Sequence, residues 1–88
     1  MPAELSKKET EIIDEVRLLM APLPDLSLRE VADRAGTHAS VLCNWQRRRV
    51  SLRPAVQRQV RAIVRTEFSK HAAHVAELAA RHGIEAAG

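Results

Sequence analysis

The feature that most constrains the fold is the twenty-residue segment from Leu28 to Arg47, LREVADRAGTHASVLCNWQR. Two short stretches with apolar residues at helical spacing flank one glycine, Gly36, which can adopt the left-handed conformation that ends a helix. The residues expected to face inward are Val31, Ala32, Ala35, Leu42 and Trp45. The segment therefore predicts two short helices that pack closely across a sharp turn.

Composition and length favour a single small helical domain. The hydrophobic residues of the 88-residue chain are mostly Ala, Val, Leu and Ile, with one Trp, one Phe and no Tyr. Together with the low glycine content, this composition favours helices over a sheet. We therefore expect an all-α fold, a small bundle of four to five helices that forms one domain over residues 1–88.

A serine followed three residues later by glutamate marks two helix starts. Ser6 and Ser27 both fit this capping box, in which the hydroxyl accepts from the glutamate amide and the glutamate side chain reaches back. The first box begins a helix expected over residues 6–20. The second begins the two paired helices, expected over residues 27–49, with Thr37 as the N-cap of the later one.

A longer helical pattern occupies the C-terminal part of the chain. Ser51 is its expected N-cap, and Pro54 is tolerated in its first turn. The helix is expected over residues 51–82, where the alanine-rich stretch 69–82 either continues it or forms a fifth helix. Its inward stripe is expected to consist of Val56, Val60, Ile63, Val64 and Phe68.

Positive charge is concentrated in the middle of the chain. The net charge is +3, but residues 34–70 carry nine basic and one acidic side chain, and no acid lies between Arg34 and Thr66. A charged stretch is often only a solvated helix face, yet ion pairs within one helix cannot form where acids are missing. We therefore expect an anionic partner for these arginines, such as DNA phosphates.

Paired short helices with an arginine-rich end are typical of the helix-turn-helix, whose second helix fits the DNA major groove. The alternative is an ordinary amphipathic helical hairpin. The segment from Ser27 to Phe68 resembles the headpiece of the lactose-repressor family in the Val-Ala pair of LREVADRAG, the glycine that ends that helix, and the Val50–Ser51 step before the next. The run NWQRRR is similar to phage-repressor and transposase-type motifs.

The resemblance implies a DNA-binding domain, with two departures from the lactose-repressor pattern. An extra helix precedes the motif, and the chain lacks the hinge and sugar-sensing domain of that family. We therefore expect a compact phage, plasmid or small bacterial regulator.

Four residues on the outer face of the second paired helix are expected to contact bases. Asn44 can pair with adenine through its amide, and Arg47 can pair with guanine or hold a phosphate. Ser40 can bond to several bases, and Ala39 can touch a thymine methyl. The family resemblance implies the same early positions, Ala39, Ser40 and Asn44. Trp45 can stack on a base or pack in the core, and its helical register favours the core.

Residues at helix starts and beyond the second paired helix are expected to contact the DNA backbone. Helix N-termini offer free amides, and arginines offer positive charge. The expected set is Ser27, Thr37, His38, Arg48, Arg49, Arg53 and Arg58. Arg58, Arg61 and Arg65 share one face of the C-terminal helix. Contact with phosphates and simple solvation of that face are equal alternatives for these side chains.

No pattern in the sequence indicates an enzyme, a metal site or a membrane segment. The single cysteine, Cys43, excludes an intrachain disulfide and fits a reducing compartment. His71 and His74 are spaced to share a metal, but no thiolate or carboxylate cluster completes such a site. No apolar run is long enough to span a bilayer. We expect no catalytic residues, no metal, no cofactor, no small-molecule effector, and a cytoplasmic, nucleoid-associated protein.

These observations together predict a sequence-specific regulator of transcription that binds double-stranded DNA. We expect a repressor that acts as a homodimer on a two-fold operator and either blocks a promoter or contacts RNA polymerase. As the dimer surface, the segment from His71 to His82 is favoured over the N-terminal helix. Once the core is built, the apolar side chains of this segment have little left within the chain to pack against. The alternatives are a phage DNA-packaging or replication-initiation subunit, and an adaptor whose arginine-rich face binds an acidic protein.

Overall fold

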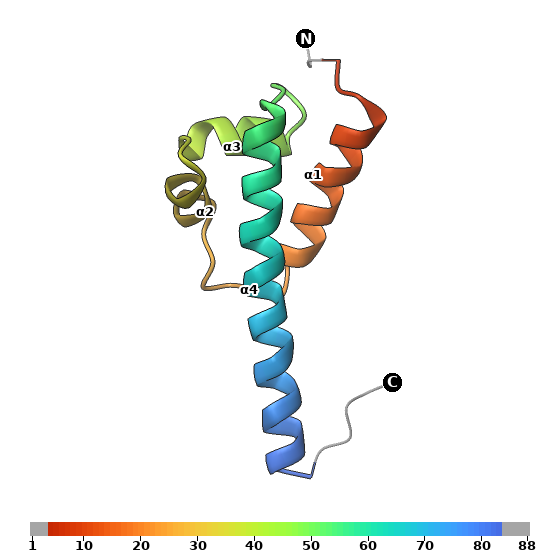
Figure 1. Ribbon diagram of the computed structural model, residues 1–88, viewed down its shortest axis with the longest axis vertical. Coiled ribbons are helices and arrows are strands. Elements are labelled where there is room, and N and C mark those ends of the chain that lie inside the picture. The colour runs from red at the N-terminus through yellow and green to blue at the C-terminus, as the bar shows by residue number, and fades with distance from the viewer. Residues whose placement is uncertain (1–3, 84–88) are drawn as a thin grey trace.

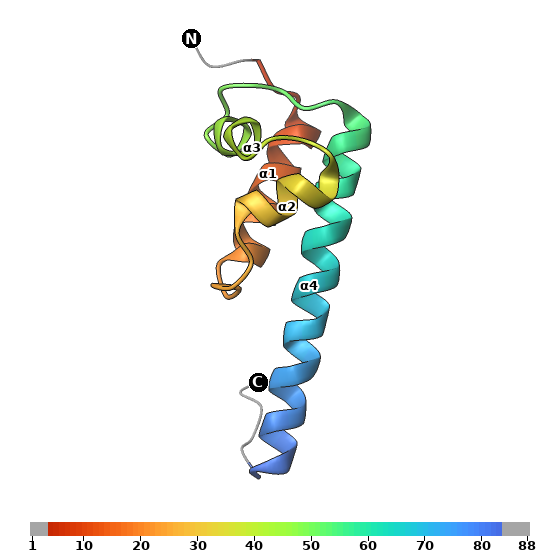
Figure 2. The ribbon, with the colours of Figure 1, turned by 90° about the vertical axis from the view of Figure 1, so that its left-hand side faces the viewer.

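Four helices make up the described part of the chain and confirm the expected all-α fold (Figure 1). The computed structural model describes residues 4–83. The helices are α1 (Lys7–Met20), α2 (Leu28–Ala35), α3 (Ala39–Gln46) and α4 (Pro54–Arg81). In Figure 2, α1, α2 and α3 lie on one side of the first half of α4, and the second half extends beyond them.

Serine hydroxyls begin α1 and α2, as the two capping-box patterns predict. Ser6 Oγ accepts from the amide of Glu9 at 3.0 Å, and Ser27 Oγ accepts from the amide of Glu30 at 3.1 Å. An N-cap of this kind stabilises a helix by about 1 kcal/mol. The carboxylate of Glu9 does not return to the start of α1, because it accepts hydrogen bonds from three groups elsewhere in the molecule.

The starts of α3 and α4 differ from the prediction, because neither has a side-chain cap. The N-caps are His38 for α3 and Arg53 for α4, so Thr37 and Ser51 are wrong as predicted caps. The amide of Thr37 instead closes the end of α2. The hydroxyl of Ser51 donates to Glu9 and is therefore engaged away from the start of α4.

The same backbone motif ends α2 and α3, with a different residue in the left-handed position. Gly36 has a φ of 76° after α2, and Arg48 has a φ of 61° after α3. In each case the following amide donates to a carbonyl five residues earlier, at 2.9 Å after α2 and 2.8 Å after α3. This is the Schellman motif. Consequently α3 ends at Gln46, and the prediction that the paired helices extend to residue 49 is wrong by three residues.

The core lies where α1, α2 and α3 meet the first half of α4. Full burial of a Val, Leu or Ile side chain contributes about 1.5–3 kcal/mol to the stability of the fold. Most of the residues predicted to face inward are buried, whereas Ala35, Val56 and Phe68 are only half-buried. The largest fully buried side chains are Trp45, Ile13, Leu42, Val16, Val31, Val60 and Val64.

The last helix runs unbroken from Pro54 to Arg81, so residues 69–81 continue it and form no fifth helix. Its second half differs from the first in burial. Val60 and Val64 are fully buried, whereas Val75 is 49% exposed and Leu78 is 38% exposed. The first half of α4 therefore supports the core, and the second half carries apolar side chains that the described residues leave in water.

Candidate nucleic-acid interface

The two faces of α3 are sharply different. Leu42 and Trp45 are fully buried on its inner side, which confirms that the tryptophan belongs to the core. On the outer side Ser40 is exposed and Asn44 is half-buried, and Arg47 follows directly after the helix, exposed. Ala39 and Cys43 are half-buried between these positions. Of the four residues predicted to contact bases, the outer face of α3 thus brings together Ser40, Asn44 and Arg47, whereas Ala39 lies at its edge and packs against the core.

A buried carboxylate fixes α3 and the α3–α4 loop against α1. Glu9 is 6% exposed and accepts from Trp45 Nε1 at 2.9 Å, from Ser51 Oγ at 2.8 Å and from the Leu52 amide at 2.9 Å. Burial alone raises the pKa of Glu9, but the three hydrogen bonds outweigh it and leave the pKa below its usual value. The carboxylate therefore stays ionised and satisfies three donors at the junction.

The role of Glu9 in this junction is not evident from the sequence, where the residue fits only a capping box. The bonded groups lie 36 to 43 residues away along the chain. One signal was present in the sequence: a fully buried tryptophan needs an acceptor for its indole N–H. Several acids of the N-terminal segment could have supplied that acceptor, so the sequence does not select Glu9.

The N-terminus of α3 is open on the outer side. His38 is exposed and makes no capping hydrogen bond with its side chain. The amide of Val41 donates to the His38 carbonyl at 3.0 Å, so the amides of Ala39 and Ser40 are the ones at this helix start that a ligand can reach. Thr37 is half-buried beside His38. Thr37 and Arg53 line the same shallow groove, at the start of α3 and of α4 respectively. Of the predicted backbone contacts, the structure thus gathers Thr37, His38 and Arg53 at one end of α3.

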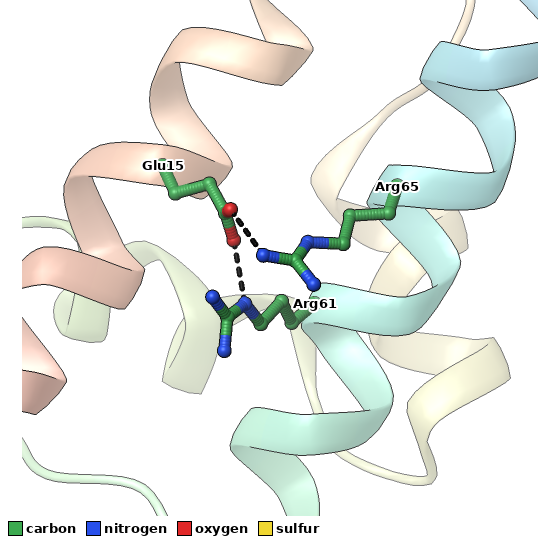
Figure 3. A network of polar contacts seen from close by, with 3 residues as sticks. All are labelled: Glu15, Arg61 and Arg65. Atoms are coloured by element: carbon green, nitrogen blue, oxygen red, sulfur yellow. Dashed lines mark hydrogen bonds and ion pairs between the residues drawn. The ribbon is translucent and has the colours of Figure 1, made fainter.

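Several arginines of the positive stretch bind carboxylates of other helices. Glu15 on α1 accepts from Arg61 Nε at 2.7 Å and from Arg65 at 2.6 Å (Figure 3). The hydrogen bond from Arg65, opposed in part by burial and aided by Arg61, lowers the pKa of Glu15. Arg48 binds Asp14 at 2.7 Å. These arginines therefore have partners within the chain.

A further pair joins α2 to α4. Arg34 binds Glu67 at 3.0 Å, and its hydrogen bond lowers the pKa of that carboxyl. The absence of acids within the stretch is therefore a weaker argument for an external anion than the sequence indicates, because acids outside the stretch meet several of its arginines in space. Phosphate contact by Arg61 and Arg65 loses its main support.

Four other arginines of the stretch form no ion pair with any carboxylate of residues 4–83, and all four are exposed: Arg47, Arg49, Arg53 and Arg58. Arg47 and Arg49 follow α3, and Arg53 lies in the groove at its start. Arg58 lies apart from them, in a groove between α1 and α4 that Lys8 also lines. Ser27, at the start of α2, is exposed with its hydroxyl already used as a cap.

The remaining features define no other site in the described residues. His71 and His74 line a groove beside the α1–α2 loop, but residues 4–83 hold no cluster of three or more side chains able to bind a metal ion. Within the same range, no helix has the length and apolar character needed to cross a membrane. Comparison of the chain with known protein families, with curated proteins and with solved structures finds no match.

Proposed function

We propose that the chain is a sequence-specific regulator that binds double-stranded DNA through a helix-turn-helix formed by α2 and α3. One observation carries the proposal: the outer face of α3 is polar and is flanked by arginines without a carboxylate partner in residues 4–83, whereas other arginines of the stretch are neutralised. Two eight-residue helices around a glycine turn match the size of this motif. The regulator acts as a homodimer on a two-fold operator and represses transcription by blocking a promoter.

In this mechanism α3 enters the major groove with its outer face toward the base edges. The amide of Asn44 donates to and accepts from one adenine, and Arg47 at the end of α3 reaches a guanine or the adjoining phosphate. Ser40 and Ala39, one turn earlier, contact the neighbouring base pair. Asn44 is half-buried, and a side chain that is already partly packed loses less entropy when it makes a contact.

Phosphates on the two sides of the groove are bound by groups at the ends of α3. The open amides at its start, together with Thr37, His38 and Arg53, suit one phosphate. Arg49, beyond its end, suits another. The Glu9 junction supports this arrangement because it holds the start of α4, and hence Arg53, at a fixed position relative to α3.

Selection of bound duplexes from a random library, followed by sequencing, tests the proposal. A palindromic consensus is the expected result, and its symmetry reports a dimer. The alternatives give other outcomes. A phage packaging or initiation subunit is expected to form rings, which light scattering detects by their mass. An adaptor for an acidic protein enriches no duplex at low salt, and that result contradicts the proposal.

A further inference from the structure

The second half of α4 leaves uncovered the face that its first half buries. In the first half this face carries Val60 and Val64, both fully buried. Helical spacing continues the same face through His71, Val75 and Leu78. In Figure 2, α1, α2 and α3 lie beside the first half of α4, and none of these three helices reaches the end of its second half. From Phe68 to His82 the residues on this face are separated by alternating steps of three and four, which is the spacing found where two helices pack along each other. They are Phe68, His71, Val75, Leu78 and His82.

The charges beside this face suit a second copy of the same helix running in the opposite direction. Along one flank the order is Glu67, Lys70, His74, Glu77 and Arg81. Within one chain Lys70 lies 3.7 Å from Glu67 and Arg81 lies 2.8 Å from Glu77, and Glu67 also binds Arg34. When two copies meet head to tail about His74, Glu67 also faces Arg81 of the other copy and Lys70 faces its Glu77, so each carboxylate gains a cation from the second copy. Each attractive pair forms twice by symmetry, and no like charges meet apart from the central histidines.

The position of the other helices selects the same direction. The helices α1, α2 and α3 pack against the face of α4 that carries Val60 and Val64, and helical spacing continues this face to Val75 and Leu78. A parallel pair that meets through this face would therefore place both sets of helices in the same space. An antiparallel pair places them at opposite ends. Arg81 of the second copy then reaches the groove between α4 and the α1–α2 loop, which Glu30 and Glu67 line.

We propose that residues 68–82 form an antiparallel homodimer interface with Val75 and Leu78 at its centre and the Lys70–Glu77 and Glu67–Arg81 pairs on its flank. This inference gives a surface and a direction to the homodimer assumed in the proposed function. It depends only on α4 and is tested without DNA. A dimer that binds no duplex would leave this interface standing and contradict the regulator alone.

Sedimentation equilibrium of the full chain measures the association. The wild-type chain is expected to dimerise, and Leu78→Asp is expected to raise the dimer dissociation constant at least about tenfold, since a charge then lies at the centre of the interface. Ala73→Asp is the matched control, because Ala73 lies on the opposite face of the same helix and is exposed. Circular dichroism shows whether each variant keeps its helices. A wild-type monomer, or a dimer that Leu78→Asp leaves unchanged, would overturn the proposal.

Charge reversal tests the direction. Lys70→Glu and Glu77→Lys, each alone, place like charges opposite each other and are expected to weaken the dimer by roughly threefold or more. An equimolar mixture of the two variants restores both attractive pairs in a heterodimer, so association recovers to near the wild-type level. A parallel pair does not bring residues 70 and 77 together and predicts no recovery. Absence of recovery would therefore refute the antiparallel arrangement.

Discussion

Six of the eight arginines from Arg34 to Arg65 form two groups with different surroundings. On the side of α1, Arg48, Arg61 and Arg65 bind carboxylates that precede them by 34 to 50 residues. Around α3, Arg47, Arg49 and Arg53 are exposed and bind no carboxylate of residues 4–83. The two sets look alike in the sequence. In a positive stretch, therefore, only the arginines that no carboxylate of another helix neutralises indicate an external ligand.

The comparison assigns the two regions separate tasks. On the α1 side, ion pairs and the Glu9 junction join α1 to α3 and α4, and the α3 side is the one that we propose binds DNA. Substitutions that remove the α1-side ion pairs should change stability with little effect on binding. Substitutions on the α3 side should do the reverse.

The largest expected effect concerns the Glu9 junction. Glu9→Ala leaves the indole N–H of Trp45 and the amide of Leu52 buried without an acceptor, and is expected to lower the free energy of unfolding by about 3 kcal/mol. Urea denaturation measures this loss. Glu11→Ala is the control, since Glu11 is an exposed acid of the same helix. Equal stability of the two variants would show that the junction contributes nothing.

Asn44→Ala is expected to alter which duplexes are bound more than how tightly duplexes are bound in general. Loss of the bidentate adenine contact removes about 1–3 kcal/mol of discrimination at one base pair. Competition between the selected duplex and a version mutated at that base pair measures the change. If the variant is as stable as the wild-type chain and discriminates equally well between the two duplexes, Asn44 does not contact a base.

Arg53→Ala is expected to weaken binding to all duplexes equally, by a few-fold, and to reduce the slope of log affinity against log salt by about 1. The reason is that a phosphate contact carries no sequence information. Affinity measured over a salt series tests this, with Arg17→Ala on α1 as a control that removes one exposed charge. A loss confined to one sequence would instead indicate a base contact.

The smallest expected effect is on the Glu15 ion pairs. The pKa of Glu15 is lowered in the folded chain, so the stability that it contributes is present above the unfolded-state value of about 4.5 and is lost as the pH falls through the folded-state pKa. Glu15→Gln should cost about 1 kcal/mol or less near neutral pH. It should also flatten the acid branch of the stability–pH curve, with duplex affinity unchanged. A variant with the acid branch of the wild type would contradict this role.

Local signals in the sequence predict much of the fold. The features that were not predicted are a left-handed residue that no glycine marks and contacts between residues far apart in the sequence. Gly36 was predictable because only glycine adopts the left-handed position without strain. Arg48 occupies the corresponding position after α3 with no glycine to mark it, so the predicted helix was too long. The inner face of α3 followed from helical spacing. Glu9 and Glu15 could not be assigned, because their partners are brought to them only by the packing of α1 against α3 and α4.

The central claim is that the α3 side, and not the α1 side, binds DNA. Two variants that each remove two positive charges test it: Arg47→Ala with Arg53→Ala, and Arg61→Ala with Arg65→Ala. Fluorescence anisotropy with the selected duplex at low salt is expected to show a loss of affinity of roughly thirtyfold or more for the first variant and less than about threefold for the second. Equal losses would mean that only total charge matters, and would contradict the division of the molecule into a structural side and a DNA-binding side.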